Sequence, residues 1–170
     1  MNKESETINY GDAVIRCGNL LAEKSNTIAF AESATAGKLA YAFSLTPYSG
    51  AILRGSIVCY NACVKEDVLG VTKEIVDRYT PESAEVTREM CKALKLQMPA
   101  DVIVAVTGLT APGGSETKEK PVGTMFFCIL YKELLHEYRM VLKGTPTQIV
   151  DKSIAEICQK ICIVLDGGSV

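Results

Sequence analysis

An uninterrupted apolar run near the middle of the chain constrains its fold more than any other feature. Residues 102–106 are all valine, isoleucine or alanine, with no polar residue between them. A strand that is apolar at every position, rather than at alternate ones, is typical of a central strand covered on both faces. The run therefore predicts a sheet that lies between two layers of helices.

Helices and strands are expected to alternate along most of the chain. Strands are predicted over residues 27–30, 51–60, 101–106, 122–131 and 134–142, with a bend at Gly55 in the second. Helices are predicted over residues 12–24, from Ser33 to about 45, and over 61–69, 80–97 and 145–164. This order indicates one domain, residues 1–170, with an α/β fold: a three-layer α/β/α sandwich around a mixed, mostly parallel five-stranded sheet.

Capping signals indicate where two of these helices start. Thr80, Pro81 and Glu82 combine a capping threonine with a proline suited to the first helical position. Residues 145–148 read Thr-Pro-Thr-Gln, which is a capping box that also has proline at its first position. The intervening residues 107–121 form a loop rich in glycine, proline and threonine. It is too long for a simple connection and is therefore a candidate functional loop.

Composition and charge exclude several classes of protein. With 48% apolar and 22% charged residues, the 170-residue chain is suited to a folded core. Its net charge of −2 and its scattered lysine and arginine residues provide no surface for nucleic acid. Residues 1–6 are polar, no apolar signal segment follows them, and no stretch is long enough to cross a bilayer. We therefore expect a cytoplasmic protein without a membrane partner.

The cysteines and the histidine do not indicate a metal site. The seven cysteines form no Cys-x-x-Cys motif, and their apolar surroundings predict buried, reduced thiols. Cys59 and Cys63 are four residues apart, as are Cys158 and Cys162, but neither pair has a carboxylate cluster nearby. The only histidine, His136, is expected on the surface of a strand, which argues against a histidine-dependent serine or cysteine mechanism.

Ser33 follows the first strand at the point where a helix is expected to begin. Its hydroxyl can cap that helix, which is the commoner use of a serine at such a junction. It can also attack a carbonyl group as a nucleophile, with the N–H groups of Ala34 and Thr35 near the developing oxyanion. The local sequence leaves both interpretations open.

Three predicted turns fall at the carboxyl ends of strands, where open α/β sheets bind ligands. They are the turn at Ser33, the turn after Tyr60 and the loop from Thr107. A serine nucleophile without histidine needs another base, and a lysine with a lowered pKa can serve, often with a tyrosine. Lys65 and Tyr60 lie in this region, although a solvated helix lysine and a strand-end aromatic are the commoner interpretations.

A series of short motifs extends from about Tyr10 to Ile163. They are Ala31-Glu32-Ser33-x-Thr35-x-Gly37, Pro47-x-Ser49-x-Ala51, Gly55 with Val58 and Tyr60, Lys65-x-x-x-Leu69-Gly70-Val71, Ser83 with Glu89-Met90, Thr107-Gly108-Leu109 with Pro112-Gly113, and Glu119-Lys120-Pro121-Val122-Gly123-Thr124. In this order and spacing they resemble the C-terminal domain of CinA proteins, whose active members are nicotinamide-nucleotide amidases.

The resemblance implies a three-layer α/β/α domain that hydrolyses the carboxamide of nicotinamide mononucleotide, giving nicotinate mononucleotide and ammonia, without a metal or organic cofactor. The family's catalytic serine, lysine and tyrosine correspond to Ser33, Lys65 and Tyr60. Ser33 would attack the carboxamide carbon. Lys65 would accept the proton of Ser33 and later deliver a proton to the departing ammonia, and Tyr60 would orient these groups or relay the proton. The residues expected to bind the substrate are Glu32, Ala34, Thr35, Ser49, Thr107, Gly108 and Lys120.

Several positions depart from the family pattern. Where the family usually has cysteine, glycine and asparagine, this chain has Ala34, Ala36 and Ala62. The usual Ala-Gly-Pro is replaced by Thr110-Ala111-Pro112, and the usual Gly-Asp-Arg by Gly144-Thr145-Pro146. Loss of the Asp-Arg pair removes a charge partner near the last helix.

Two functions of different class are compatible with these observations. The first is an amidohydrolase that acts on a nicotinamide nucleotide. The second is a catalytically inactive nucleotide-binding or regulatory domain of the same fold. In both cases the expected partner is a small nucleotide and not a nucleic acid. Self-association is also expected, although not established, because the N-terminal domain that often accompanies the family is not among the 170 residues.

Overall fold

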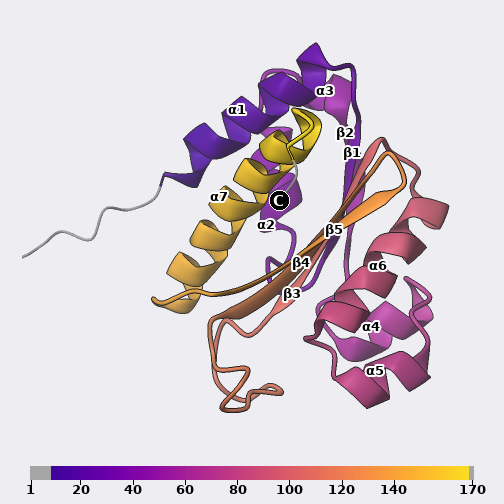
Figure 1. Cartoon of the computed structure of the whole chain (residues 1–170), viewed down its shortest axis with the longest axis vertical. Coiled ribbons are helices and arrows are strands. Elements are labelled where there is room, and N and C mark those ends of the chain that lie inside the picture. The colour runs from indigo at the N-terminus through magenta and orange to yellow at the C-terminus, as the bar shows by residue number, and fades with distance from the viewer. Residues whose placement is uncertain (1–8, 169–170) are drawn as a thin grey trace, which may run out of the picture.

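A computed structural model describes residues 9–168, so residues 1–6, on which the prediction of a missing signal segment rests, lie outside it. The described residues form a five-stranded sheet with the order β2-β1-β3-β4-β5 (Figure 1). The strands are β1 (Ile28–Glu32), β2 (Leu53–Val58), β3 (Val102–Gly108), β4 (Thr124–Tyr131) and β5 (Leu134–Val141). β1 pairs in parallel with β2 and β3, whereas β4 and β5 are antiparallel to their neighbours. The sheet is mixed, as predicted, with two parallel and two antiparallel pairings.

Helices cover both faces of this sheet (Figure 1). One face carries α1 (Tyr10–Glu23), α2 (Lys38–Ser44), α3 (Ser49–Ile52) and α7 (Pro146–Leu165). The other face carries α4 (Ala62–Asp67), α5 (Lys73–Tyr79) and α6 (Ala84–Gln97). The prediction of a fully covered central strand is confirmed, because residues 102–107 of β3 are all buried.

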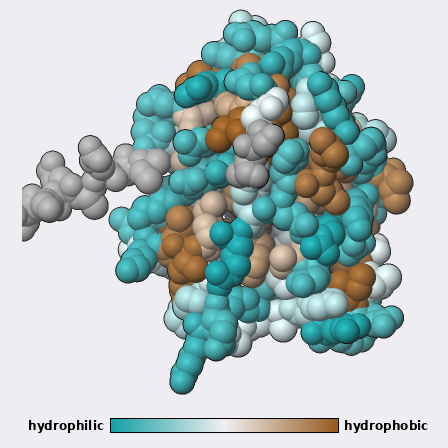
Figure 2. All heavy atoms as spheres, viewed as in Figure 1, coloured by the Kyte–Doolittle hydropathy of each residue, from teal (hydrophilic) through white to brown (hydrophobic). Residues whose placement is uncertain are grey.

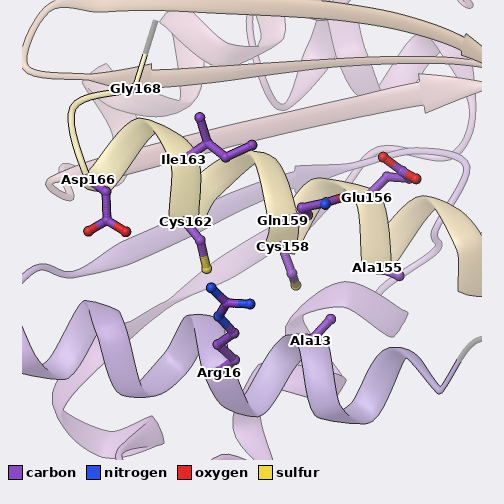
Figure 3. Close-up of a pocket in the computed structure, with 10 residues that line it drawn as sticks. All are labelled: Ala13, Arg16, Ala155, Glu156, Cys158, Gln159, Cys162, Ile163, Asp166 and Gly168. Atoms are coloured by element: carbon purple, nitrogen blue, oxygen red, sulfur yellow. The ribbon is translucent and has the colours of Figure 1, made fainter. Parts of the chain in front are cut away.

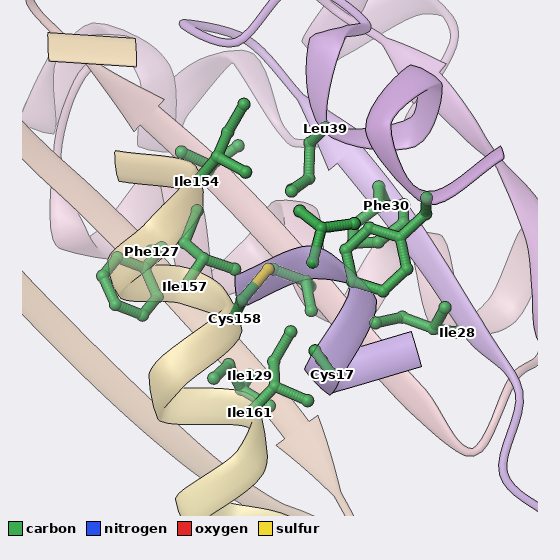
Figure 4. Packing of buried hydrophobic residues seen from close by; sticks show 14 of the residues in the cluster. Cys17, Ile28, Phe30, Leu39, Phe127, Ile129, Ile154, Ile157, Cys158 and Ile161 are labelled. Carbon is green, nitrogen blue, oxygen red and sulfur yellow. The ribbon is translucent and has the colours of Figure 1, made fainter. Parts of the chain in front are cut away.

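Successive strand residues point to opposite faces and build a separate core on each. Phe30 of β1 and Phe127 of β4 point toward α7, where they pack with Ile157 (Figure 4). The neighbouring positions, represented by Ala31 and Cys128, point the other way and pack beneath α6. The sheet therefore lies between two separate hydrophobic cores.

The start of α6 differs from the prediction. Its N-cap is Ser83, whose hydroxyl accepts a hydrogen bond from the Val86 N–H at 3.2 Å. Thr80 instead ends α5, a helix that the sequence did not predict, and has a φ of 70°, which is strained for a β-branched residue. The predicted helix start at Thr80 and Pro81 is therefore wrong, because α6 begins three residues after Pro81, at Ala84. The capping box at Thr145 is confirmed as the start of α7.

Two smaller predictions also have clear outcomes. Gly55 bends β2 as expected: its φ is 146°, and the pairing with β1 shifts register next to it. Six of the seven cysteines are buried and none forms a disulfide, but Cys63 is exposed. Cys59 lies before α4, so it does not share a helix face with Cys63.

The visible surface is predominantly hydrophilic. Figure 2 shows hydrophobic atoms on this face in separate patches between hydrophilic ones. Within residues 9–168, none of the helices combines the length and the apolar character that a membrane span requires.

Candidate active site

Ser33 lies directly after β1, at the carboxyl end of the parallel strands. Its N–H donates a hydrogen bond to the Val106 carbonyl of β3 at 3.0 Å, so it is still held by the sheet. The chain then turns, and the Ala36 N–H donates to the Ser33 carbonyl at 3.0 Å. β1 is paired on both sides, so the sheet fixes the position of Ser33 at the carboxyl end of this strand. Ser33 is only 5% exposed.

The prediction that Ser33 caps the next helix is wrong. α2 begins at Lys38, and its N-cap is Gly37, which has a φ of 92° and no side chain to accept a hydrogen bond. The residues from Ala34 to Gly37 form a turn between Ser33 and the helix. The Ser33 hydroxyl is therefore not used by the helix terminus.

Glu32 stabilises the start of α2 in place of a cap. The donors to its two carboxylate oxygens are the N–H groups of Gly37, Leu39 and Ala40 and the hydroxyls of Thr35 and Ser56. A buried carboxylate at the positive end of a helix is favourable when such donors surround it. Glu32 and the Thr35 hydroxyl, both predicted to bind substrate, are thus occupied within the protein and shape the turn that carries Ser33.

Lys65 of α4 is fully buried, which is unusual for a lysine. Its Nζ lies 3.1 Å from Ser33 Oγ and 3.0 Å from the Cys59 carbonyl oxygen, with the Tyr60 carbonyl oxygen at 3.5 Å. Asn61 caps α4 by accepting a hydrogen bond from the Cys63 N–H, which places Lys65 one turn inside the helix. The short path from the end of β2 into α4 brings Lys65 over the end of β1.

Burial lowers the pKa of Lys65 below the ordinary lysine value, because the charged form loses its hydration. The negative charge of Glu82 acts in the opposite direction, but less strongly. Within residues 9–168, Lys65 forms no ion pair with a carboxylate. A neutral amine has two N–H bonds and one lone pair, so the carbonyls of Cys59 and Tyr60 can accept the N–H bonds while the lone pair faces the Ser33 hydroxyl.

Tyr60 occupies a different position from the one its predicted role requires. Its side chain is 66% exposed, and only its main-chain carbonyl accepts a hydrogen bond from Lys65. In the described part of the chain, no hydrogen bond joins its phenol to Ser33 or Lys65. The side chain does line the cavity next to Ser33, so it is placed to contact a ligand there.

A cavity of about 250 Å³ opens beside Ser33. Its other walls are formed by Ala34, Tyr60, Glu82 and the segment 108–114 at the start of the β3–β4 loop. That loop extends beyond the sheet edge at the bottom of Figure 1. Glu82 was not predicted as a site residue, because Thr80-Pro81-Glu82 was interpreted only as a helix start. The one feature of the sequence that could have indicated Glu82 as a site residue is its carboxylate, which lies in a connection close to the predicted cleft.

The structure gives Thr107 and Gly108 packing roles. The Thr107 hydroxyl is buried and shares a hydrogen bond of 2.8 Å with the Thr87 hydroxyl of α6, and Thr107 is not among the residues that line the cavity. A Cβ at Gly108 would lie 2.8 Å from the Thr124 carbonyl oxygen and still closer to the Met125 sulfur. Gly108 lines the cavity, but the antiparallel pairing with β4 already requires a glycine there.

Lys120, predicted to contact phosphate, instead fixes the loop. Its Nζ donates to the Thr80 hydroxyl at 2.7 Å, the Glu82 carbonyl at 2.8 Å and the Ser115 hydroxyl at 2.7 Å. A lysine ammonium has three N–H donors, so all of them are engaged. Lys120 therefore ties the β3–β4 loop to the α5–α6 connection and supports one wall of the cavity.

Ser49 is not brought to the site. It begins α3, which leads into β2 at the end that pairs with Ile28, the first residue of β1. Ser33 follows the opposite end of β1. The parallel strands therefore separate Ser49 from the cavity by their full length.

The backbone after Ser33 offers free donors. Within residues 9–168, the N–H groups of Ala34 and Thr35 donate no hydrogen bond to another residue. Ala34 also lines the cavity. These N–H groups are therefore available to an oxygen atom that develops negative charge near Ser33.

A larger cavity of about 570 Å³ lies elsewhere, between α1 and α7 (Figure 3). Cys158 and Cys162 point from α7 toward α1, and Arg16 points back toward them. None of the predicted site residues lines it. Within the described residues, no three histidine, cysteine, aspartate or glutamate side chains gather in a way that could hold a metal ion.

Fold and geometry define an α/β domain with a buried serine–lysine pair at the carboxyl ends of its parallel strands. Residues 12–163 match the CinA C-terminal domain. The chain therefore belongs to the CinA C-terminal domain family, which confirms the resemblance seen in its motifs.

Two curated relatives, both named CinA-like protein, come from Pseudothermotoga lettingae and Petrotoga mobilis. The first is 38% identical over 128 residues, which are 72% of this chain and 30% of the relative. The second is 33% identical over 143 residues, which are 84% of this chain and 35% of the relative. The chain thus spans only about a third of the length of these relatives.

Crystal structures of CinA superfamily proteins share the fold. The protein from Klebsiella pneumoniae 700603 has a TM-score of 0.87 at 24% identity, with 94% of this chain and 99% of that chain covered. The protein from Escherichia coli has a TM-score of 0.86 at 23% identity, with 96% and 94% covered. At these identities the likeness shows the fold, and the function must be argued from the site.

Proposed function

We propose that this chain is an amidohydrolase that converts nicotinamide mononucleotide to nicotinate mononucleotide and ammonia. The observation that carries the proposal is the contact of 3.1 Å between Lys65 Nζ and Ser33 Oγ in a buried setting. A hydroxyl beside an amine with a lowered pKa is suited to nucleophilic attack on an amide. The choice of nucleotide rests on the family to which the chain belongs.

In the first half of the reaction, Ser33 Oγ attacks the carboxamide carbon while Lys65 Nζ takes the hydroxyl proton. The carbonyl oxygen becomes an oxyanion that the N–H groups of Ala34 and Thr35 can stabilise. The C–N bond then breaks as Lys65 returns the proton to the departing nitrogen. The products of this half are ammonia and an ester between Ser33 and the nicotinoyl group.

In the second half, water attacks the ester carbon and Lys65 accepts a proton from it. The bond to Ser33 Oγ breaks, and Oγ recovers its proton from Lys65. One amide and one water are consumed, and one carboxylic acid and one ammonia are released. No metal or organic cofactor takes part in the proposed steps.

The alternative function, nucleotide binding without turnover, is favoured by two observations. The side chain of Tyr60 is exposed, and in the part of the chain that the structure describes its phenol forms no hydrogen bond with Ser33 or Lys65. The three donors of Lys120 are already engaged, so this lysine is not free for the substrate phosphate. Under this alternative, the substitutions around the cavity have preserved the fold and removed the activity.

Ammonia release from nicotinamide mononucleotide tests the proposal. The unmodified protein should release ammonia, whereas Ser33→Ala and Lys65→Met should not. Lys92→Met is a matched control, because Lys92 is an exposed lysine of α6 whose one ion pair among residues 9–168 is with Glu89. Tight nucleotide binding by a folded protein that releases no ammonia would support the alternative.

A further inference from the structure

Glu82 places a carboxylate on the wall of the cavity that contains Ser33. It lies in the connection between α5 and α6, immediately before the N-cap Ser83. One carboxylate oxygen, Oε2, accepts a hydrogen bond of 2.5 Å from the Ser115 hydroxyl. Within residues 9–168, the carboxylate forms no ion pair. The carboxylate is therefore oriented by the Ser115 hydroxyl, which also accepts from Lys120 Nζ, and among the described residues it has no lysine or arginine in direct contact.

Glu82 dominates the charge of the cavity. Among the described residues that line it, Glu82 is the only one that has an acidic or basic side chain of the Asp, Glu, Lys, Arg or His type. Neither Lys65 nor Lys120 lines the cavity. Lys120 donates to the main-chain carbonyl of Glu82 and to the Ser115 hydroxyl, which in turn donates to the Glu82 carboxylate. A concave wall with one carboxylate attracts cations and repels anions such as phosphate.

The size of the cavity points to the part of the ligand that enters it. Pockets for whole drug-sized ligands usually exceed about 300 Å³. At about 250 Å³ the cavity is better suited to an aromatic ring with its carboxamide than to a complete nucleotide. A phosphate group would then remain outside, away from the carboxylate.

We propose that Glu82 forms a binding site for a positively charged ring and makes the protein selective for pyridinium carboxamides over neutral ones. This inference rests on the proposed amidase function, because Ser33 supplies the point to which the carboxamide is directed. The ring nitrogen of an oxidised nicotinamide nucleotide is quaternary and carries a positive charge, whereas free nicotinamide and reduced nicotinamide nucleotides have neutral rings. Glu82 therefore distinguishes substrates by ring charge while Ser33 acts on the amide.

Binding of two matched probes tests this selectivity without turnover. The probes are nicotinamide, which is neutral, and its N-methylpyridinium form, which carries the same carboxamide on a cationic ring. We expect the Ser33→Ala protein to bind the cation more tightly than the neutral amide by about tenfold or more, as measured by NMR titration at neutral pH. If the Ser33→Ala protein binds the two probes with equal affinity, the proposal is overturned before any variant of Glu82 is needed.

The variant Glu82→Gln then assigns the preference to the carboxylate. Glutamine keeps the size and an oxygen acceptor for Ser115, so the loop contact is retained. In this variant the affinity for the cationic probe, divided by that for the neutral probe, should fall close to one. Glu116→Gln is the matched control, because Glu116 accepts from the Gly113 N–H at the cavity rim but does not line the cavity. A preference that survives Glu82→Gln, or is lost equally in the control, would contradict the proposal.

Ammonia release by the unmodified protein separates the two proposals. If no amide is hydrolysed but the Glu82-dependent preference is present, the amidase function fails and the cation site remains. If nicotinamide mononucleotide is hydrolysed but ring charge has no influence on binding, the cation site fails and the amidase function remains.

Discussion

Lys65 Nζ lies 3.1 Å from Ser33 Oγ, although the two residues are 32 positions apart in the chain. The Cys59 carbonyl accepts from the same Nζ at 3.0 Å, so the amine is held from two sides. Ser33 is fixed by β1, and Lys65 is fixed by the first turns of α4. The positions of the two side chains are therefore set by β1 and α4. Four predictions depend on this arrangement.

Replacing Lys65 with arginine should abolish ammonia release while leaving a positive charge. Arginine cannot be deprotonated in a protein, so it cannot accept the Ser33 proton. We expect kcat to fall by about a hundredfold to ten-thousandfold, the usual contribution of a general base. Steady-state rates of Lys65→Arg, with circular dichroism as a check on folding, measure this. Activity close to that of the unmodified protein would show that Lys65 is not the base.

The pH dependence of kcat/KM should report the pKa of Lys65. The base must be neutral to act, so the rate should rise with pH and level off above that pKa. Because burial lowers the pKa of Lys65, the plateau should begin below the ordinary lysine value of 10.5. A pH profile measured with Tyr60→Phe beside the unmodified protein provides the control. A rising limb that disappears in Tyr60→Phe would assign the titration to Tyr60 instead.

Glu32→Gln should destabilise the fold as well as the site. The amide would present N–H groups where the carboxylate now accepts from the backbone of α2. Losing charge-assisted hydrogen bonds to a buried group costs about 2–3 kcal/mol. Denaturant unfolding measures this loss, and Glu74→Gln, an exposed carboxylate at the start of α5, should change stability little. Equal stability of the two variants would contradict the role assigned to Glu32.

Ala36→Gly should stabilise the turn after Ser33. Ala36 has a φ of 49°, in the left-handed region that costs an alanine about 1–2 kcal/mol. The greater freedom of glycine in the unfolded chain offsets part of this gain, which leaves about 0.5 kcal/mol of net stabilisation. Ala93→Gly, within α6, should instead destabilise by about 1 kcal/mol. A loss of stability in both variants, seen as a lower denaturant midpoint, would show that the turn is not strained at Ala36.

Much of the fold could be predicted from local sequence. The apolar run ending at Val106 predicted a covered central strand, and the capping box at Thr145 predicted the start of α7; both are confirmed. Local signals were less reliable where two competed. Thr80 and Pro81 resembled a helix start, but the side chain of Ser83 makes the capping hydrogen bond.

The candidate site could be predicted only in part. The three turns at the carboxyl ends of strands predicted one cleft that contains Ser33 and Lys65, but the sequence did not show that the two side chains meet. The sequence did not show that Ser49 lies at the other end of the sheet, or that Lys120 is engaged by the α5–α6 connection. Both depend on how separate segments pack.

The sequence by itself determined the five strands, most of the helices and the family, because these follow from residue patterns within short stretches and from the order of the motifs. The resemblance to that family then indicated Ser33 and Lys65 as candidate nucleophile and base. Only the tertiary structure decided that Glu32 is occupied by the start of α2, that Tyr60 is exposed, and that Glu82 lines the cavity. The physical reason is that burial, hydrogen-bond partners and pKa depend on groups far apart in the chain. Their arrangement becomes defined only when the sheet and its two helical layers have packed.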